Sequence, residues 1–206
     1  MLIALFIHPK SDINHFLNNS KFIELLNNTN YILNIYYTKT ESFLEFMNLF
    51  NTFELPFNKI YSNKLPDLKN ISIEHFLESS EDLYLNLDTN VSLCSYSFLQ
   101  NSEFLSMTSI TAPLILKKNE LFSNFWGDVD DNGFYKRSDN YISIVNRTQT
   151  GKFDAKYINS CFFMPRTIAQ LVLNFYKLNY KNNWDYDVTF SHNCRLNKIP
   201  MTLCNF

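Results

Sequence analysis

The chain has 206 residues with a formal net charge of -2, and 46% of its residues are apolar. This length allows one domain with a substantial buried core, and the apolar content excludes a disordered chain. The slight negative charge argues against a protein that neutralises many nucleic-acid phosphates, and four cysteines without a C-x-x-C pair indicate reduced thiols in the core.

The first 77 residues alternate strand-like and helix-like segments. Residues 2–8 form a continuous apolar run that is too short for a membrane span, and no small-residue cleavage site follows it, so we predict a first strand. Further strands are predicted at residues 31–37 and 57–61. Helices are predicted from apolar spacing at Phe16, Ile23 and Leu26, at Phe43, Phe46, Met47 and Phe50, and at Ile73, Phe76 and Leu77. This alternation predicts an α/β fold with a mixed, mainly parallel sheet flanked by helices.

The fourth predicted strand, residues 82–87, runs directly into Asp88, Thr89 and Asn90. Ligands of parallel α/β sheets bind beyond the carboxyl ends of the strands. A carboxylate, a spacer and a second oxygen ligand at such an end could hold a divalent cation. The alternative is a strand that simply stops at the turn-forming residues Asp and Asn.

All three glycines of the chain fall within residues 121–151, at Gly127, Gly133 and Gly151. Glycine adopts backbone conformations that other residues avoid. With Trp126 and several other aromatic residues beside them, these glycines predict a shaped loop and a hairpin over a pocket. A helix at residues 95–105 and a strand at residues 107–112 are predicted just before this segment.

Asn132 and Gly133 are typical of a hairpin turn. A second interpretation is a calcium-binding loop, because Asp128, Asp130 and Asn132 alternate and Asp139 occupies the twelfth position. The flanking helical patterns of a calcium loop are missing, so the hairpin is favoured.

The last elements are a strand at residues 157–164, a helix that Pro165 opens, and a terminal strand at residues 199–204. Between them, Trp184, Asp185, Tyr186 and Asp187 lead into another helix. Carboxylates at the start of a helix often serve only as caps, which is the alternative to a catalytic role here.

Three segments of the second half carry a distinctive pattern: Ala112-Pro113-Leu114, Ser123-Asn124-Phe125-Trp126-Gly127, and Gly133-Phe134-Tyr135-Lys136-Arg137-Ser138 with Tyr141. At these residues the chain resembles the glycosyltransferase-A-type domains of the collagen-modifying proteins. Those domains are the middle domain of procollagen-lysine hydroxylases and the first domain of collagen hydroxylysine galactosyltransferases. The same alignment places Asp88 and Asn90 on the family's V-D-A-D pattern and Asp185 and Asp187 on its D-P-D or F-D-D pattern. The resemblance implies a single glycosyltransferase-A-like domain over residues 1–206, with a nucleotide-sugar-binding half (1–94) and an acceptor half (95–206).

The resemblance also implies an activity. A hexose, with glucose favoured over galactose, would pass from a uridine diphosphate sugar to collagen galactosylhydroxylysine or hydroxylysine. Manganese or another divalent cation would bind Asp88 and Asn90, with His192 as a further ligand, and Asp187 and Asp185 would serve the acceptor hydroxyl. The implied donor-binding residues are Trp126, Asn124, Tyr135, Arg137, Trp184 and Asn205.

The chain departs from the family pattern at Asn90, which replaces a carboxylate. The amide oxygen remains a ligand, but the lost charge is expected to weaken the binding of a hard cation. The alternative function is therefore a catalytically silent collagen-binding domain with the same fold. For single residues the alternatives are a core aromatic at Trp126 and a helix-surface histidine at His192. The sequence leaves a monomer and a homodimer open.

Overall fold

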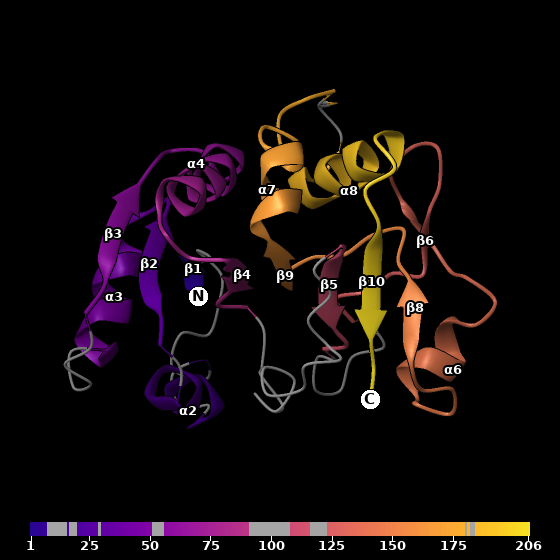
Figure 1. Cartoon of the computed structure of the whole chain (residues 1–206), viewed down its shortest axis with the longest axis horizontal. Helices are drawn as coiled ribbons and strands as arrows, with labels where there is room; N and C mark the ends of the chain where they lie inside the picture. The colour runs from indigo at the N-terminus through magenta and orange to yellow at the C-terminus, as the bar shows by residue number, and fades with distance from the viewer. Residues whose placement is uncertain are drawn as a thin grey trace.

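The computed structural model describes residues 1–7, 16, 20–28, 30–50, 56–90, 108–115, 123–179, 181 and 184–206. These residues form an eight-stranded sheet with helices on both faces and a separate two-stranded hairpin (Figure 1). The large sheet has the order β3-β2-β1-β4-β9-β5-β10-β8. Its strands are β1 (Leu2–Ile7), β2 (Ile32–Tyr37), β3 (Asn58–Tyr61), β4 (Leu83–Asp88), β5 (Ile110–Pro113), β8 (Lys152–Asp154), β9 (Cys161–Pro165) and β10 (Met201–Cys204).

Most neighbours in the sheet are parallel. Strands β3, β2, β1 and β4 run in one direction, and β10 is parallel to β5. Strand β9 lies antiparallel between β4 and β5, and β8 is antiparallel to β10 at one edge. The prediction of a mixed, mainly parallel sheet is thus confirmed, and one sheet joins the two predicted halves of the domain.

The sheet buries both of its faces. Alternate residues of β1 point to opposite sides, so Leu2, Ala4 and Phe6 join one core while Ile3 and Leu5 join the other. The first core packs against α4, α7 and α8, and the second against α2 and α3, which lie on opposite sides of the sheet in Figure 1. The described helices are α2 (Ser20–Asn28), α3 (Thr40–Phe50), α4 (Leu65–Glu78), α6 (Tyr141–Val145), α7 (Arg166–Val172) and α8 (Tyr186–Leu196).

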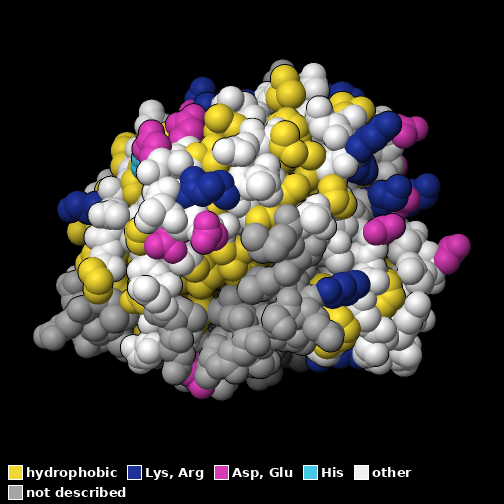
Figure 2. Space-filling view, viewed as in Figure 1, with side chains coloured by type: hydrophobic (Ala, Val, Ile, Leu, Met, Phe, Trp, Pro, Cys, Tyr) yellow, Lys and Arg dark blue, Asp and Glu magenta, His cyan; other side chains and the backbone are white. Residues whose placement is uncertain are grey.

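Charge is dispersed over the surface. On the face shown in Figure 2, Lys and Arg side chains are interspersed with Asp and Glu and form no continuous basic stripe. This view agrees with the small net charge of the chain. None of the helices in the described part of the chain has the length and apolar character that crossing a bilayer requires.

The predicted hairpin is confirmed between β6 (Asp128–Val129) and β7 (Tyr135–Lys136). Gly133, with φ of +82°, donates its N–H to the carbonyl of Asp130 at 3.1 Å. The Asp130 Oδ1 atom accepts from the backbone N–H groups of Asn132 and Phe134, both at 2.9 Å. This carboxylate therefore closes the turn, and the described residues contain no group of three His, Cys, Asp or Glu side chains that could hold a metal ion. The structure gives the calcium-loop interpretation no support.

Several boundaries differ from the predictions. Strand β9 begins at Cys161, because the preceding chain makes only an isolated bridge between Ile158 and Phe125. Helix α7 ends at Val172, shortly before Asn174 adopts a φ of +71°. Strand β8 and helix α6 were not predicted. The predicted helix at residues 95–105 and the start of the strand at residue 107 lie outside the described residues.

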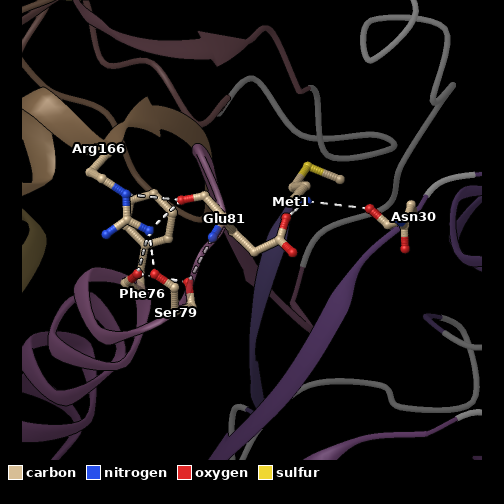
Figure 3. A network of polar contacts seen from close by, with 6 residues as sticks. All are labelled: Met1, Asn30, Phe76, Ser79, Glu81 and Arg166. Carbon is tan, nitrogen blue, oxygen red and sulfur yellow. Dashed lines mark hydrogen bonds and ion pairs between the residues drawn. The ribbon is translucent and has the colours of Figure 1, made fainter.

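Arg166 fixes the end of α4 to the start of α7 (Figure 3). Its guanidinium group donates to the carbonyl oxygens of Leu77 at 2.8 Å, Ser79 at 2.7 Å and Phe76 at 3.1 Å, and its Nε donates to that of Glu81 at 3.1 Å. The last carbonyls of a helix have no partner within the helix, so these bonds satisfy the end of α4. Helix α4 is thereby held over β4.

Candidate active site

Asp88 ends β4 at the carboxyl edge of the sheet, where it is paired in register with Phe6 of β1. Its backbone N–H donates to the carbonyl of Ser160 at 2.8 Å, and the next N–H, of Thr89, donates to the carbonyl of Phe6 at 3.0 Å. Both neighbouring strands thus hold the residue in place. The residue is only 1% exposed, so the charge of its side chain requires a partner inside the protein.

Lys69 of α4 supplies that partner. Its Nζ lies 2.5 Å from Asp88 Oδ1 and 2.8 Å from Asn86 Oδ1, and the side chain is 0% exposed. The ammonium group also lies 3.7 Å from the centroid of the Phe6 ring, within the range of a cation–π interaction. Sequence reasoning missed Lys69. The available signal was its position four residues before Ile73 and seven before Phe76, on the buried face of the helix.

Asp187, in the first turn of α8, completes the arrangement. Burial raises the pKa of its carboxyl well above the usual range, Lys69 opposes this rise, and the charges of Asp185 and Asp88 add to it. Tyr186, the neighbour of Asp187, has its ring centroid 6.0 Å from Lys69 Nζ. The structure therefore brings the start of α8 to the end of β4, and we call Lys69, Asp88, Asp185 and Asp187 the charge cluster.

The two carboxylates of α8 differ in their surroundings. Asp185 is the exposed N-cap of the helix, and its Oδ1 accepts the backbone N–H of Asp187 at 2.8 Å. Asp187 is only 4% exposed. A carboxyl group with a raised pKa is a stronger base than an ordinary one, which suits it to take a proton from a hydroxyl group. Asp185 instead stabilises the helix that positions Asp187.

The predicted metal ligands do not all come together. Asn90 is exposed two residues beyond Asp88, at the same edge of the sheet. His192 lies elsewhere, with its ring centroid 4.8 Å from that of Trp184. Burial and the charges of Arg195 and Lys181 lower the pKa of His192, so its imidazole is neutral at neutral pH.

Trp126 lies near the charge cluster but outside it. Its ring stacks on Tyr157 at a centroid distance of 4.0 Å and meets Tyr135 edge to face at 6.1 Å. Burial raises the pKa of Tyr157 well above its usual value, and Asp187 and Asp185 contribute to that rise. Tyr157 thus contacts Trp126 and also feels the charge of the carboxylates of α8. Arg137 is exposed, with its guanidinium carbon 5.9 Å from the centroid of the Tyr141 ring.

Trp184 and His192 belong to a different cavity of about 380 Å³. We call it the hairpin–helix pocket, because residues 128–131 of the hairpin form one wall and α8 forms another. The complete lining comprises Asp128, Val129, Asp130, Asp131, Lys156, Trp184, His192, Arg195 and Leu196. The expectation of a hairpin over a pocket agrees with this arrangement.

Two predicted donor-binding asparagines use both the nitrogen and the oxygen of their side-chain amides in hydrogen bonds to the backbone. Asn124 Nδ2 donates to the carbonyl of Pro113 at 2.7 Å, and its Oδ1 accepts from Ile115 N at 2.8 Å. Asn205 Nδ2 donates to the carbonyls of Ile144 and Gln149, and its Oδ1 accepts from Gly151 N at 2.8 Å. Both amides brace the loops around the sheet edge, and their contact with a donor stays a prediction.

Comparisons with known proteins agree with this geometry. A family model described as the glycosyltransferase family 25 N-terminal domain matches residues 56–206. The chain is 33% identical over 129 residues to procollagen-lysine,2-oxoglutarate 5-dioxygenase 1 of Gallus gallus, covering 60% of the chain and 17% of that relative. It is 31% identical over 137 residues to the procollagen lysyl hydroxylase and glycosyltransferase of Acanthamoeba polyphaga mimivirus, covering 65% and 15%. It is 33% identical over 117 residues to human procollagen galactosyltransferase 2, covering 53% and 18%.

Solved structures with the same fold are more distant in sequence. A protein of Desulfovibrio desulfuricans described as a nucleotide-diphospho-sugar transferase aligns with a TM-score of 0.55 at 10% identity, covering 99% of this chain and 79% of its own. The 4-diphosphocytidyl-2C-methyl-D-erythritol synthase of Anaerococcus prevotii aligns with a TM-score of 0.56 at 10% identity, covering 100% and 88%. At this identity the likeness establishes the fold alone, a glycosyltransferase-A-like α/β fold. The three sequence relatives are much longer proteins, of which the chain spans 15% to 18%.

Proposed function

The chain belongs to the glycosyltransferase family 25 N-terminal domain family, and from this membership we propose that it transfers a hexose from a uridine diphosphate sugar to collagen. The acceptor is hydroxylysine or the galactose already attached to it. The names of the relatives support this class of substrate, since one is a procollagen galactosyltransferase and another combines a procollagen lysyl hydroxylase with a glycosyltransferase. Glucose is the favoured donor sugar, with galactose as the second.

The charge cluster is the observation that carries the proposal. It lies beyond the carboxyl end of a central parallel strand, where folds of this type bind nucleotides. Asp88 pairs with the buried ammonium of Lys69, whose charge also acts against the raised pKa of the buried Asp187. If these residues served only to stabilise the core, apolar side chains would be expected in their place, because buried ion pairs add little net stability.

A divalent cation such as manganese fits this site if the donor brings most of its ligands. Asp88 Oδ1 is engaged by Lys69, which leaves the second carboxylate oxygen and the amide oxygen of Asn90 as protein ligands. Ions of this kind are commonly held by one or two carboxylates together with substrate phosphates. When bound, the ion neutralises the negative charge of the departing diphosphate.

In the proposed reaction, the acceptor hydroxyl oxygen forms a bond to C1 of the hexose. The bond between C1 and the diphosphate oxygen breaks, and uridine diphosphate leaves with the electron pair. The hydroxyl proton passes to Asp187, whose raised pKa makes it a suitable base. Lys69 positions Asp88 through its ion pair, and Asp185 positions Asp187 through the helix cap.

The test is a transfer assay with labelled UDP-glucose and UDP-galactose, manganese, and collagen peptides with and without galactosylhydroxylysine. We expect labelled peptide from the wild-type chain, and a loss of about 100-fold or more in Asp187→Asn, as for other general bases. Asp88→Asn should lose transfer activity, and added manganese should no longer increase the activity that remains. Asp139→Asn, an exposed carboxylate in the same half of the chain, is the matched control and should keep full activity.

A wild-type chain that transfers neither sugar to either peptide would contradict the proposal. The alternative, a catalytically silent collagen-binding domain, then predicts peptide binding without stabilisation by nucleotide. A thermal-shift measurement separates the two, because a ligand that binds only the folded state raises the melting temperature. Stabilisation by uridine diphosphate with manganese supports the enzyme, and collagen binding without it supports the alternative.

A further inference from the structure

The hairpin–helix pocket lies outside the charge cluster, on a different face of α8. Trp184, Val188 and His192 are spaced four residues apart, and Trp184 and Val188 pack together in one small cluster with Tyr157. Neither Asp187 nor Asp88 lines this pocket. The pocket volume of about 380 Å³ is at the small end of the range of ligand sites, roughly 300–1,000 Å³.

Trp184 presents an unused hydrogen-bond donor at this pocket. The residue is only 6% exposed, and its indole N–H donates to no acceptor in the described part of the chain. Gly133 packs closely against the indole ring, because a Cβ atom there would lie 2.5 Å from the indole nitrogen. The nitrogen is not among the buried unpaired side-chain atoms of the described residues, so this N–H is open to solvent or to a ligand.

One wall of the pocket carries hydrogen-bond acceptors and the other carries mainly donors. The hairpin wall carries carboxylate acceptors: Asp131 is exposed, while Asp128 Oδ1 accepts the N–H of Val129 and its Oδ2 lies 4.0 Å from Lys136 Nζ. The helix wall carries donors, which are the indole N–H and the guanidinium of Arg195. The neutral imidazole of His192 adds one donor and one acceptor.

Neither sign of charge suits this pocket. A cation would meet Arg195 and Lys156, and the face of Trp184 is already covered by Lys181, whose Nζ is 4.2 Å from the ring centroid. An anion would meet the carboxylates of Asp128 and Asp131. A neutral ligand whose groups both donate and accept satisfies both walls, and hydroxyl groups do this.

We propose that the hairpin–helix pocket binds one hexose unit of a saccharide, through the Trp184 indole N–H and Arg195 on one side and the carboxylates of Asp128 and Asp131 on the other. The sugar is either free or attached to a hydroxylysine residue, and the recognised chemistry is the same in both. The site is separate from the charge cluster, so its binding does not depend on the transfer reaction.

The test uses the indole N–H signals of the 15N-labelled chain, which has only two tryptophans. A Trp126→Phe variant assigns the Trp184 signal. Glucose, galactose and a galactosylhydroxylysine peptide are titrated separately, and glycerol, lysine and the unglycosylated peptide are the controls. We expect the sugars to cause a saturable shift of the Trp184 signal. Tighter binding of the free sugar or of the peptide-linked sugar then shows which of the two forms the pocket recognises.

Variants of exposed residues make the test specific. Asp131→Ala should weaken sugar binding about tenfold, the loss of one hydrogen bond to a charged group, while Asp139→Ala should leave it unchanged. The proposal is wrong if no sugar gives a saturable shift up to about 100 mM, the weak limit for a specific site. It is equally wrong if lysine shifts the signal as the sugars do, or if Asp131→Ala binds them normally. Because this readout needs no turnover, its failure is distinct from a failure of the transfer assay.

Discussion

Lys69→Met tests whether the buried ammonium holds the charge cluster together. The substitution keeps the length of the side chain but leaves Asp88 buried without its ion-pair partner, and it removes the positive charge that acts on Asp187. Breaking a buried ion pair from one side costs about 3–5 kcal/mol. In a domain of this size each kcal/mol lowers the melting temperature by about 2–4 °C, so we expect a fall of roughly 6–20 °C. Circular dichroism melts at constant pH measure this change directly.

Lys177→Met is the matched control, because Lys177 Nζ pairs with Asp67 at 2.6 Å on the surface, where half of the lysine side chain is exposed. A surface pair of this kind contributes about 0–1 kcal/mol. The double variant Lys69→Met with Asp88→Asn removes both buried charges and should regain much of the stability lost in Lys69→Met. Equal melting temperatures for Lys69→Met and Lys177→Met would refute the reasoning, and so would a double variant that is no more stable than Lys69→Met.

Two further substitutions test the same physical picture. Because the pKa of Asp187 is raised in the folded state, its stabilising contribution is present below the unfolded pKa and is lost as pH rises through the folded pKa. Asp187→Asn should therefore melt higher than the wild type near about pH 8, with a difference that shrinks towards pH 4; an equal or lower melting temperature at the higher pH would contradict this. Gly133→Ala should destabilise more than Gly151→Ala in urea unfolding, since both glycines have positive φ but only at Gly133 would the added Cβ meet Trp184, at 2.5 Å. Equal losses would show that the contact with Trp184 carries no cost.

The strands of the sheet could be predicted from the sequence where each consists of a long run of apolar residues. Strands β1, β2 and β4 are buried runs that the sequence shows directly, and the intervening helices follow from apolar spacing. Strand β8 is a three-residue edge strand whose pairing depends on β10, nearly fifty residues later, so it left no local signal. Helix α6 has five residues, too few for a helical period to be recognised.

The site was predictable only in part. The resemblance placed Asp88 and Asp187 on two separate patterns of one family, and in the structure the charge of Asp88 contributes to the raised pKa of Asp187. Lys69 was missed because a lysine in a helix is normally exposed, and only a carboxylate nineteen residues later makes its burial favourable. His192 follows Asp187 by five residues, which turns it about 140° around α8 at 100° per residue. The two side chains therefore belong to different faces, which a linear motif does not reveal.

The charge cluster carries more negative than positive charge. Asp88 is buried in contact with the ammonium of Lys69, Asp187 is buried within the influence of that charge, and Asp185 adds a third carboxylate at the surface. This excess can be balanced by a proton on Asp187, which the raised pKa favours, or by a cation that arrives with a diphosphate. In the proposed transfer both kinds of balance are used in turn. The donor brings the cation when it binds, and Asp187 then takes the proton of the acceptor hydroxyl. The same imbalance that makes Asp187 costly for stability thus suits it to act as the base.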